Sequence, residues 1–192
     1  MRALALATCL LLLAAGCGGR ETRSGSSTAA DEPPSTSISE SEQLPPPFAL
    51  VTGGGRQNAV QGSYCLALPE VGKCADYMQL PPAELSIVAP GETVTLVLDG
   101  ALTVDGRVVV LPLGCSQKVS SVVVDAPDTT WQVDLDPGLY ELELFARFEA
   151  TAKSGDTSAS LGLQVDLAAD AAIVPVPDPL PACPDGQSRY SR

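Results

Sequence analysis

Short stretches in which apolar and polar residues alternate fill the chain from about Phe48 onward. Residues 92–100 (ETVTLVLDG) place Val94, Leu96 and Leu98 on one face, and residues 158–167 (SASLGLQVDL) alternate in the same way. Alternation with a period of two residues is typical of half-buried β-strands, because successive side chains point to opposite faces of a sheet. These segments therefore predict strands with one face in a core.

The longest alternation covers residues 140–150 (YELELFARFEA). One face of this predicted strand carries Tyr140, Leu142, Leu144, Ala146 and Phe148. The other face carries Glu141, Glu143, Phe145, Arg147 and Glu149. The second face is the polar one, so we expect it to meet solvent, with Phe145 as its one large apolar side chain.

The remaining sequence supports an all-β fold. No stretch beyond residue 17 shows a helical period, and turn residues recur roughly every 8 to 12 positions, a spacing typical of β-sandwiches. Uninterrupted valine runs in residues 106–113 and 120–126 predict more deeply buried strands. We expect an antiparallel β-sandwich over residues 47–184, followed by a disordered tail at residues 185–192.

Residues 131–144 (WQVDLDPGLYELEL) combine a strand, an Asp-Pro-Gly turn and a tyrosine that opens the next strand. This order resembles the tyrosine corner of immunoglobulin-like β-sandwiches, in which the tyrosine hydroxyl bonds to the backbone just upstream. The resemblance implies an immunoglobulin-like sandwich with Tyr140 in that role and with Asp136 and Gly138 shaping the turn. The chain departs from true immunoglobulin domains at Leu142, where that family has its second core cysteine. The resemblance implies a fold and carries no function.

The N-terminus follows a different pattern. Arg2 precedes an almost wholly apolar segment, residues 3–15, which is too short to span a bilayer comfortably but suits the apolar region of a signal peptide. Gly16 and Cys17 follow. The segment resembles the bacterial lipoprotein signal, in which a lipid is attached to the cysteine and the chain is cut before it, although Ala14 stands where leucine is most usual. The resemblance implies a signal peptide at residues 1–16 and a lipid anchor at Cys17; an ordinary signal peptide cut near Ala15 is the alternative.

Residues 17–46 are rich in Ser, Thr, Gly, Pro and acidic residues, so they predict a disordered tether with a reach of roughly 30 Å. The whole chain has a net charge of −12, and only Arg2 among its charged residues lies in the signal peptide. Such an acidic surface repels phosphate groups. We therefore exclude nucleic acids as partners.

The chain has six cysteines. Without Cys9 in the signal peptide and the lipidated Cys17, an even set remains, and in an exported chain it predicts two disulfides among Cys65, Cys74, Cys115 and Cys183. Three pairings are possible, and we favour Cys65–Cys74, which closes a local loop, with Cys115–Cys183, which fastens the C-terminal segment. The alternative is a zinc site, but the chain lacks a C-x-x-C pair and histidine.

Few residues of the chain suggest catalysis or metal binding. With no histidine, the chain lacks the means for Ser-His-Asp or Cys-His catalysis and for histidine-based metal sites. Ser116 and Lys118 lie two residues apart, a spacing that by itself gives no nucleophile and base geometry. Asp99-Gly100 and Asp105-Gly106 match no calcium-binding loop and predict hairpin turns. We expect no metal, no cofactor and no catalytic centre.

Exposed apolar residues offer a candidate contact surface. Tyr77 and Met78 follow the loop between Cys65 and Cys74, and a loop of this kind, held by a disulfide, can form a contact surface together with Phe145. The alternative, which we prefer because small sandwiches need such covers, is that the loop closes the open end of the core. The Pro-rich residues 173–183 are expected to lie along an edge strand and block further pairing.

The sequence thus predicts a lipoprotein of the cell envelope, held by Cys17 on the outer face of the cytoplasmic membrane or on an outer membrane. Its expected role is a non-catalytic binding or structural module, with the lipid bilayer and an envelope protein as partners. One alternative is a carboxylate-based hydrolase, which requires two acids in a cleft, one of them with a raised pKa. Another is a proteinase-inhibitor-like domain that presents a loop to a protease.

Overall fold

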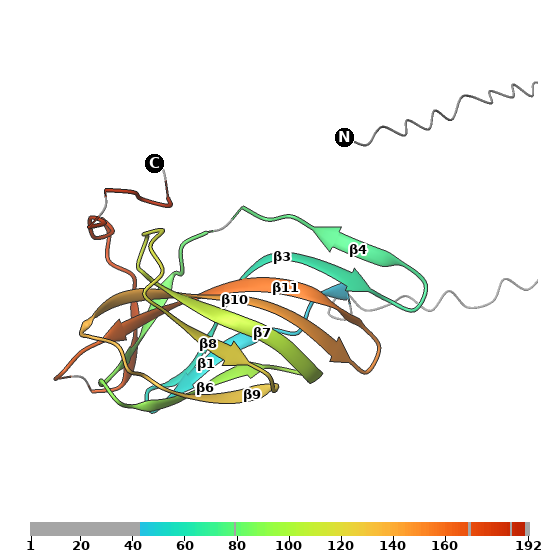
Figure 1. Cartoon of the computed structure of the whole chain (residues 1–192), viewed down its shortest axis with the longest axis horizontal. Coiled ribbons are helices and arrows are strands. Elements are labelled where there is room, and N and C mark those ends of the chain that lie inside the picture. The colour runs from blue at the N-terminus through green and yellow to red at the C-terminus, as the bar shows by residue number, and fades with distance from the viewer. Residues whose placement is uncertain (1–42, 79, 169, 185, 191–192) are drawn as a thin grey trace, which may run out of the picture. The chain divides into compact units, whose positions relative to one another are not determined.

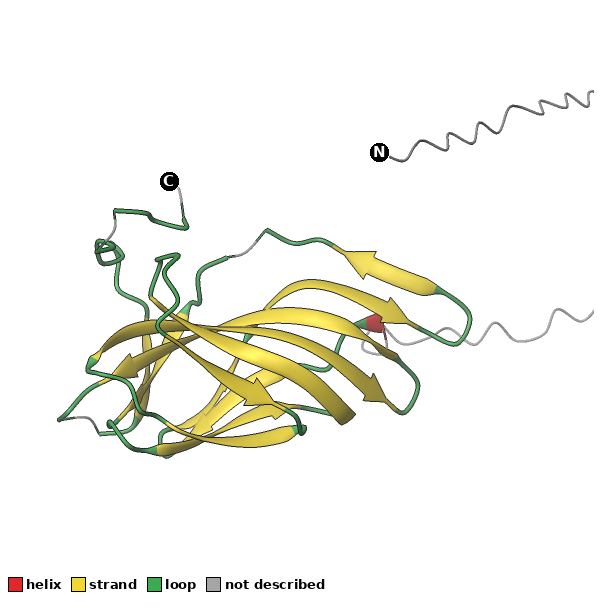
Figure 2. Cartoon of the chain, in the orientation of Figure 1, coloured by secondary structure: helices red, strands yellow, loops and turns green. Residues whose placement is uncertain are grey.

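The computed structural model describes residues 43–78, 80–168, 170–184 and 186–190, so the expected signal peptide, Cys17 and most of the expected tether lie outside the described residues. The described part contains twelve strands and no α-helix; the short helical segment in Figure 2 is a 3₁₀ turn at Gln43 (Figures 1 and 2). The strands are β1 (Phe48–Thr52), β2 (Gly55–Asn58), β3 (Val60–Ala67), β4 (Gly72–Ala75), β5 (Glu84–Val88), β6 (Thr93–Leu98), β7 (Ala101–Pro112), β8 (Ser120–Val124), β9 (Asp128–Gln132), β10 (Gly138–Ala150), β11 (Ser154–Val165) and β12 (Ala172–Pro175).

The strands form two sheets. The smaller sheet has the order β2-β1-β6-β9, and the larger sheet has the order β12-β5-β11-β10-β7-β8, with β3 paired to β11 and β4 paired to β3. All pairs are antiparallel except β5 with β11. The prediction of an all-β fold with two sheets is confirmed.

One apolar core lies between the sheets and draws on both of them. Leu50 and Leu96 contribute from the smaller sheet, and Leu142, Leu144 and Leu161 from the larger one, each of them fully buried. The alternating positions in β6, β10 and β11 supply most of these side chains. Period-two alternation therefore predicted the buried face of each of these strands correctly.

A buried polar contact also joins the two sheets. The hydroxyl of Ser86 in β5 donates a hydrogen bond of 2.7 Å to Oε1 of Gln57 in β2, and the Gln57 amide donates one of 2.7 Å to the carbonyl of Glu84. Both side chains are nearly inaccessible to solvent. Because each buried polar group has a partner, the contact fixes the register of β2 over β5 without the cost of an unsatisfied polar group.

One of the two predicted Asp-Gly turns is correct. Gly100 joins β6 to β7 with a φ of 76°, which favours glycine. The prediction of a turn at Asp105-Gly106 is wrong, because both residues lie within β7. Gly106 is required there for a different reason: a Cβ would lie 2.7 Å from the Cβ of Ala146, on the paired strand β10.

The ends of the described body also differ from the expected boundaries. Pro45 and Pro46 are buried, so they belong to the body and not to the tether. At the other end, the Pro-rich segment does supply an edge strand, since β12 pairs with β5. Residues 186–190 were expected in a disordered tail, but they contact the larger sheet, as described next.

Candidate functional site

The face of the larger sheet that points away from the core is called the outer face below. It carries Glu141, Glu143, Phe145 and Arg147 of β10, as the alternation predicts. Two environments divide this face: the last part of the chain covers the start of β10, whereas the following residues of β10 stay open to solvent.

The cover is the C-terminal strap, which consists of residues 176–184 and 186–190. A disulfide joins Cys183 to Cys115, and Arg189 donates a backbone hydrogen bond of 2.9 Å to the carbonyl of Gly114. Gly114 has a φ of 76° and lies against the side chains of Leu180 and Tyr190. On the outer face, Leu85, Leu111 and Leu113 are buried outside the main core. The strap is thus an ordered part of the fold.

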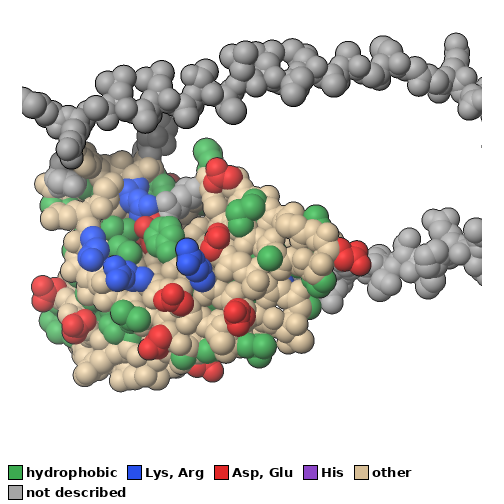
Figure 3. All heavy atoms as spheres, turned by 45° about the vertical axis from the view of Figure 1, so that its right-hand side comes forward, with side chains coloured by type: hydrophobic (Ala, Val, Ile, Leu, Met, Phe, Trp, Pro, Cys, Tyr) green, Lys and Arg blue, Asp and Glu red, His purple; other side chains and the backbone are tan. Residues whose placement is uncertain are grey.

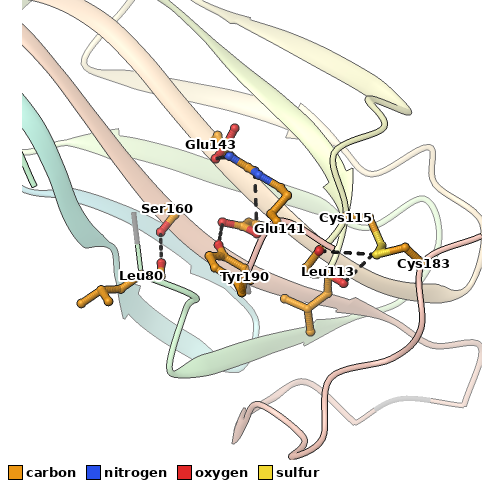
Figure 4. Close-up of polar contacts among 10 residues, drawn as sticks. Leu80, Leu113, Cys115, Glu141, Glu143, Ser160, Cys183 and Tyr190 are labelled. Atoms are coloured by element: carbon orange, nitrogen blue, oxygen red, sulfur yellow. Dashed lines mark hydrogen bonds and ion pairs between the residues drawn. A yellow bond between two sulfur atoms is a disulfide. The ribbon is translucent and has the colours of Figure 1, made fainter. Parts of the chain in front are cut away.

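Two carboxylates of β10 are held by the strap. The Tyr190 hydroxyl donates a hydrogen bond of 2.5 Å to Oε1 of Glu141, and a guanidinium nitrogen of Arg189 lies 2.5 Å from Oε1 of Glu143 (Figure 4). Glu141 is 0% exposed and Glu143 is 6% exposed, so the expectation that the polar face of this strand meets solvent is wrong for both. Burial raises the pKa of Glu141, and the contacts with Tyr190 and Arg189 offset part of that rise. Burial, together with the hydrogen bond to Glu141, raises the pKa of the Tyr190 hydroxyl.

These carboxylates bear on the hydrolase alternative. They are neighbours on one face of β10 and the pKa of Glu141 is raised, which are two features of a paired-acid site. A substrate, however, has to reach both groups, and the strap covers Glu141 completely. In this arrangement the carboxylates hold the strap in place.

Beyond the strap, the outer face is hollowed into what we call the outer groove, with a volume of about 950 Å³. Its floor is made of small side chains on β3 and β11, among them Gly62, Ser158 and Ser160. The ring of Phe145 rises on one side. Apolar side chains lie exposed among acidic and basic ones on this body (Figure 3).

The opposite wall is the segment from Asp76 to Leu80, excluding the undescribed residue 79. Ser63 holds its start, because the Ser63 hydroxyl donates a 2.6 Å hydrogen bond to Asp76 and accepts one of 3.1 Å from the amide of Tyr77. The hydroxyl of Ser160 donates a hydrogen bond of 3.4 Å to the carbonyl of Leu80 (Figure 4). The wall is therefore tied to the floor at both ends.

Close packing between β3 and β11 explains the shallow floor. A Cβ on Gly62 would lie 2.5 Å from Oγ of Ser158, and a Cβ on Gly155 would lie 2.0 Å from the carbonyl oxygen of Cys65. Larger side chains at these positions would fill the hollow or separate the strands. Small residues thus create the space, and the disulfide between Cys65 and Cys74 ties β3 to β4 beside it.

The predicted contact residues come together at this groove. Tyr77 and Phe145 line it, 50% and 52% exposed, and Met78, which adjoins Tyr77, is 86% exposed. The preferred expectation that this loop closes the core is wrong for Met78, which reaches solvent. For other residues of this segment the expectation is correct, since Leu66 belongs to the core and Leu68 and Ala75 pack against it. The ring centroid of Tyr77 lies 6.0 Å from that of the core residue Tyr64.

Sequence reasoning missed most of the other residues of the outer groove. Ionisable side chains at its lining are Asp76, Asp105, Glu143, Arg147 and Asp156. They come from three strands and a loop, so no local motif could have revealed them. The signal that was present is the set of small residues at alternate positions of β11, namely Ser158, Ser160 and Gly162, which leaves an unfilled surface on one side of the strand.

The predicted structural corner lies apart from the groove. The Tyr140 hydroxyl donates a hydrogen bond of 2.8 Å to the carbonyl of Asp136, which is the bond that a tyrosine corner requires. Gly138 leaves room for the ring, since a Cβ there would lie 3.3 Å from it. Both disulfides, Cys65–Cys74 and Cys115–Cys183, are present in the favoured pairing.

In comparisons with known proteins, no family model, no curated protein and no solved structure matches the chain. Among the described residues, no group of three or more His, Cys, Asp or Glu side chains is placed to hold a metal ion. That part of the chain also has no helix with the length and apolar character needed to cross a membrane.

Proposed function

We propose that this protein is a lipid-anchored binding module of the bacterial cell envelope and that the outer groove is its binding surface. The observation that carries the proposal is the groove itself, a hollow of about 950 Å³ in which Tyr77 and Phe145 leave half of their surface in solvent. Exposed apolar side chains gathered at a concave surface typically mark a site for a ligand or partner.

The proposed location of the protein in the cell envelope is inferred from its N-terminal sequence. Residues 1–16 have the charge, apolar length and small residues of a lipoprotein signal, and Cys17 stands where the lipid is attached. Each buried CH₂ contributes about 0.8 kcal/mol to membrane binding, so two or three acyl chains anchor a protein durably. The tether predicted over residues 17–46, shortened by the buried Pro45 and Pro46, would then separate the body from the membrane.

The fold that we propose for the body is an immunoglobulin-like sandwich. The hydrogen bond from Tyr140 to Asp136 and the two facing sheets support this assignment. The parallel pairing of β5 with β11 and the added strands β3, β4 and β12 would then be elaborations of that plan.

Mass spectrometry of the protein purified from bacterial membranes tests the anchor. We expect a mature chain that begins at Cys17 and carries fatty acids, and we expect the Cys17→Ser variant to lose both the acyl mass and the membrane fraction. A product released into the medium, without fatty acid and with another first residue, would refute the proposed address.

Site-specific photo-crosslinking in intact cells tests the binding role. A photoreactive residue at position 145, in the groove, should give a discrete crosslinked species. The same residue at the exposed position 130, in β9 of the smaller sheet, serves as the matched control. Equal crosslinking from both positions, or none from position 145, would contradict the assignment of the groove.

The hydrolase alternative ranks second because the buried Glu141 is the one group that favours it. It requires that the strap leave β10. A truncated chain ending at Pro184 would then hydrolyse glycans that the full chain leaves intact. Absence of hydrolysis by both chains favours the binding role.

A further inference from the structure

The outer groove adjoins a second hollow on the same face, and the two together are called the channel below. The second hollow, of about 510 Å³, shares Asp105, Arg147 and Asp156 with the outer groove and reaches Glu149. Together the hollows follow β10 from Glu143 to Glu149, roughly 20 Å at the rise of an extended strand. This shape fits an extended chain better than a compact molecule.

Negative charge prevails in this channel. Among its described lining residues, Arg147 is the one base, and the acids are Asp76, Asp105, Glu143, Glu149 and Asp156. Glu143 is paired with Arg189 of the strap, and the register places Arg147 between Asp105 and Asp156. Arg107, which is exposed and pairs with Phe145 in the register, adds a positive charge next to the channel. Even so, the five acids outnumber the three bases Arg107, Arg147 and Arg189, so the charge of the channel complements a cationic ligand.

The two aromatic rings fit the same ligand. Phe145 and Tyr77 are half exposed at the groove, and the face of an aromatic ring attracts an ammonium or guanidinium group within about 6 Å. A Lys or Arg side chain can lay its methylene stem on such a ring while its charged end reaches a carboxylate. The groove offers both partners within reach of one long side chain. The strand partners of Phe145 are Arg107 and Ser158, and Asp105 and Asp156 lie two residues further along β7 and β11.

Charge also argues against two other occupants. The chain's own residues 18–42 contain five acidic residues and two arginines, and the whole chain has a net charge of −12. An acidic channel repels both this segment and a second copy of the chain. The complementary occupant is therefore a different, basic chain.

We propose that the outer groove binds an extended segment of a partner protein that presents Lys or Arg at alternate positions. In an extended segment, alternate side chains point to one side, so several cations face the channel at once. This inference rests on the binding role proposed above and specifies the chemistry of the partner.

Fluorescence anisotropy tests this chemistry with the full chain purified in a neutral detergent. The probe is a labelled peptide of about eight residues in which Lys and Val alternate, compared with analogues that carry Ser or Glu in place of Lys and with an uncharged glucan hexasaccharide as competitor. We expect the Lys peptide to bind at least about tenfold more tightly than the Ser peptide, and added salt to weaken it.

Variants locate the binding. The pair Asp105→Asn with Asp156→Asn should weaken the Lys peptide about tenfold, and Phe145→Ala should weaken it about fivefold. The control pair, Asp128→Asn with Asp134→Asn, makes the same change of charge at exposed positions in β9 and just after it, away from the described lining of the channel. It should change the affinity less than about twofold. Near-UV circular dichroism shows that each variant is folded.

The outcomes separate the two proposals. The proposal of a basic partner is overturned if the Ser peptide binds as tightly as the Lys peptide. It is also overturned if the control pair of variants loses as much affinity as Asp105→Asn with Asp156→Asn. If the glucan or the Ser peptide binds and Phe145→Ala abolishes that binding, the proposal of a basic partner is overturned, but the groove remains a binding site. If no probe binds and no crosslink forms from position 145, both proposals fail.

Discussion

Glu141 and Phe145 lie four residues apart on the same face of β10, yet their surroundings are opposite. The carboxylate of Glu141 is fully buried beneath the C-terminal strap, whereas half of the Phe145 ring lies in solvent. The polarity of the side chains alone would have suggested the reverse. The exposure of these two side chains is therefore decided by whether the C-terminal strap covers them, and not by their own polarity.

The strap-covered region around Glu141 and the open region around Phe145 differ in what stabilises their side chains. Burying a charged carboxylate is costly unless hydrogen bonds and an opposite charge compensate it, and the strap brings Tyr190 and Arg189 for this purpose. The open region consists of the exposed outer-face residues Phe145, Arg147 and Glu149 of β10, and it needs no such cover because Arg147 and Glu149 keep their contact with water. The comparison teaches that the strap region serves stability, while the open region is free to serve binding.

The largest expected effect is the release of the strap from its covalent tie. Replacing Cys115 and Cys183 by Ala should lower the free energy of unfolding by about 4.4 kcal/mol, because a long loop is no longer closed in the unfolded chain. Replacing Cys65 and Cys74 by Ala opens a short loop beside the open region and should cost about 2.7 kcal/mol. Urea unfolding measures both, and a larger loss in the second variant would contradict the division of roles.

A second effect concerns the charge that compensates the buried carboxylates. Arg189→Ala leaves Glu141 and Glu143 without their nearby cation and should cost about 3 kcal/mol. The matched control is Arg147→Ala in the open region, which should change stability by less than about 0.5 kcal/mol. Similar losses from both substitutions would show that the strap does not depend on this ion pair.

The pH dependence of stability provides a third, smaller effect. Because the pKa of Glu141 is raised above its ordinary value of 4.5, the folded state holds its proton more strongly than the unfolded chain. The resulting stabilisation is complete below pH 4.5 and is lost as the pH rises through the folded pKa. Relative to Glu141→Gln, the wild type should therefore lose stability as the pH rises.

Urea unfolding at a series of pH values from acidic to neutral measures this difference. Glu149→Gln, which removes one carboxylate at an exposed position on the same face of β10, is the control. A difference between the wild type and Glu141→Gln that stays constant with pH would show that the burial of Glu141 does not affect its titration.

The smallest expected effect is in the open region. Phe145→Ser should lower the free energy of unfolding by about 1 kcal/mol or less, because half of the side chain already lies in solvent. Phe148→Ala is the contrast on the opposite face of β10, where the ring is 3% exposed and its loss should cost about 3–5 kcal/mol. Thermal unfolding compares the two. A large loss from Phe145→Ser would make this ring a structural residue and not a binding one.

Local sequence predicted the elements more completely than their surroundings. The alternation in β10 and β11 identified the buried face of each strand, and the turn residues placed Tyr140 at the corner where it bonds to Asp136. The same local reasoning failed at Asp105-Gly106, because the reason for that glycine is the close approach of Ala146 on a strand forty residues away in the chain.

The candidate site could be predicted only in part, for the same reason. The exposure of Phe145 follows from its position in the alternation, and that of Tyr77 and Met78 was one of two interpretations of their loop. Asp105 and Asp156 could not be assigned to the site, since neither lies near Phe145 in sequence order. Strand pairing alone brings them together.

By itself, the sequence determined that this chain forms two-faced strands and which side chains of each strand share a face, because a period of two is a property of the extended backbone. Only the tertiary structure decided what each outer face meets. The strap reaches β10 from residues 176–184 and 186–190, and the wall of the groove comes from residues 76–78 and 80. Contacts between segments so far apart depend on the packing of the whole chain, and no local pattern records them.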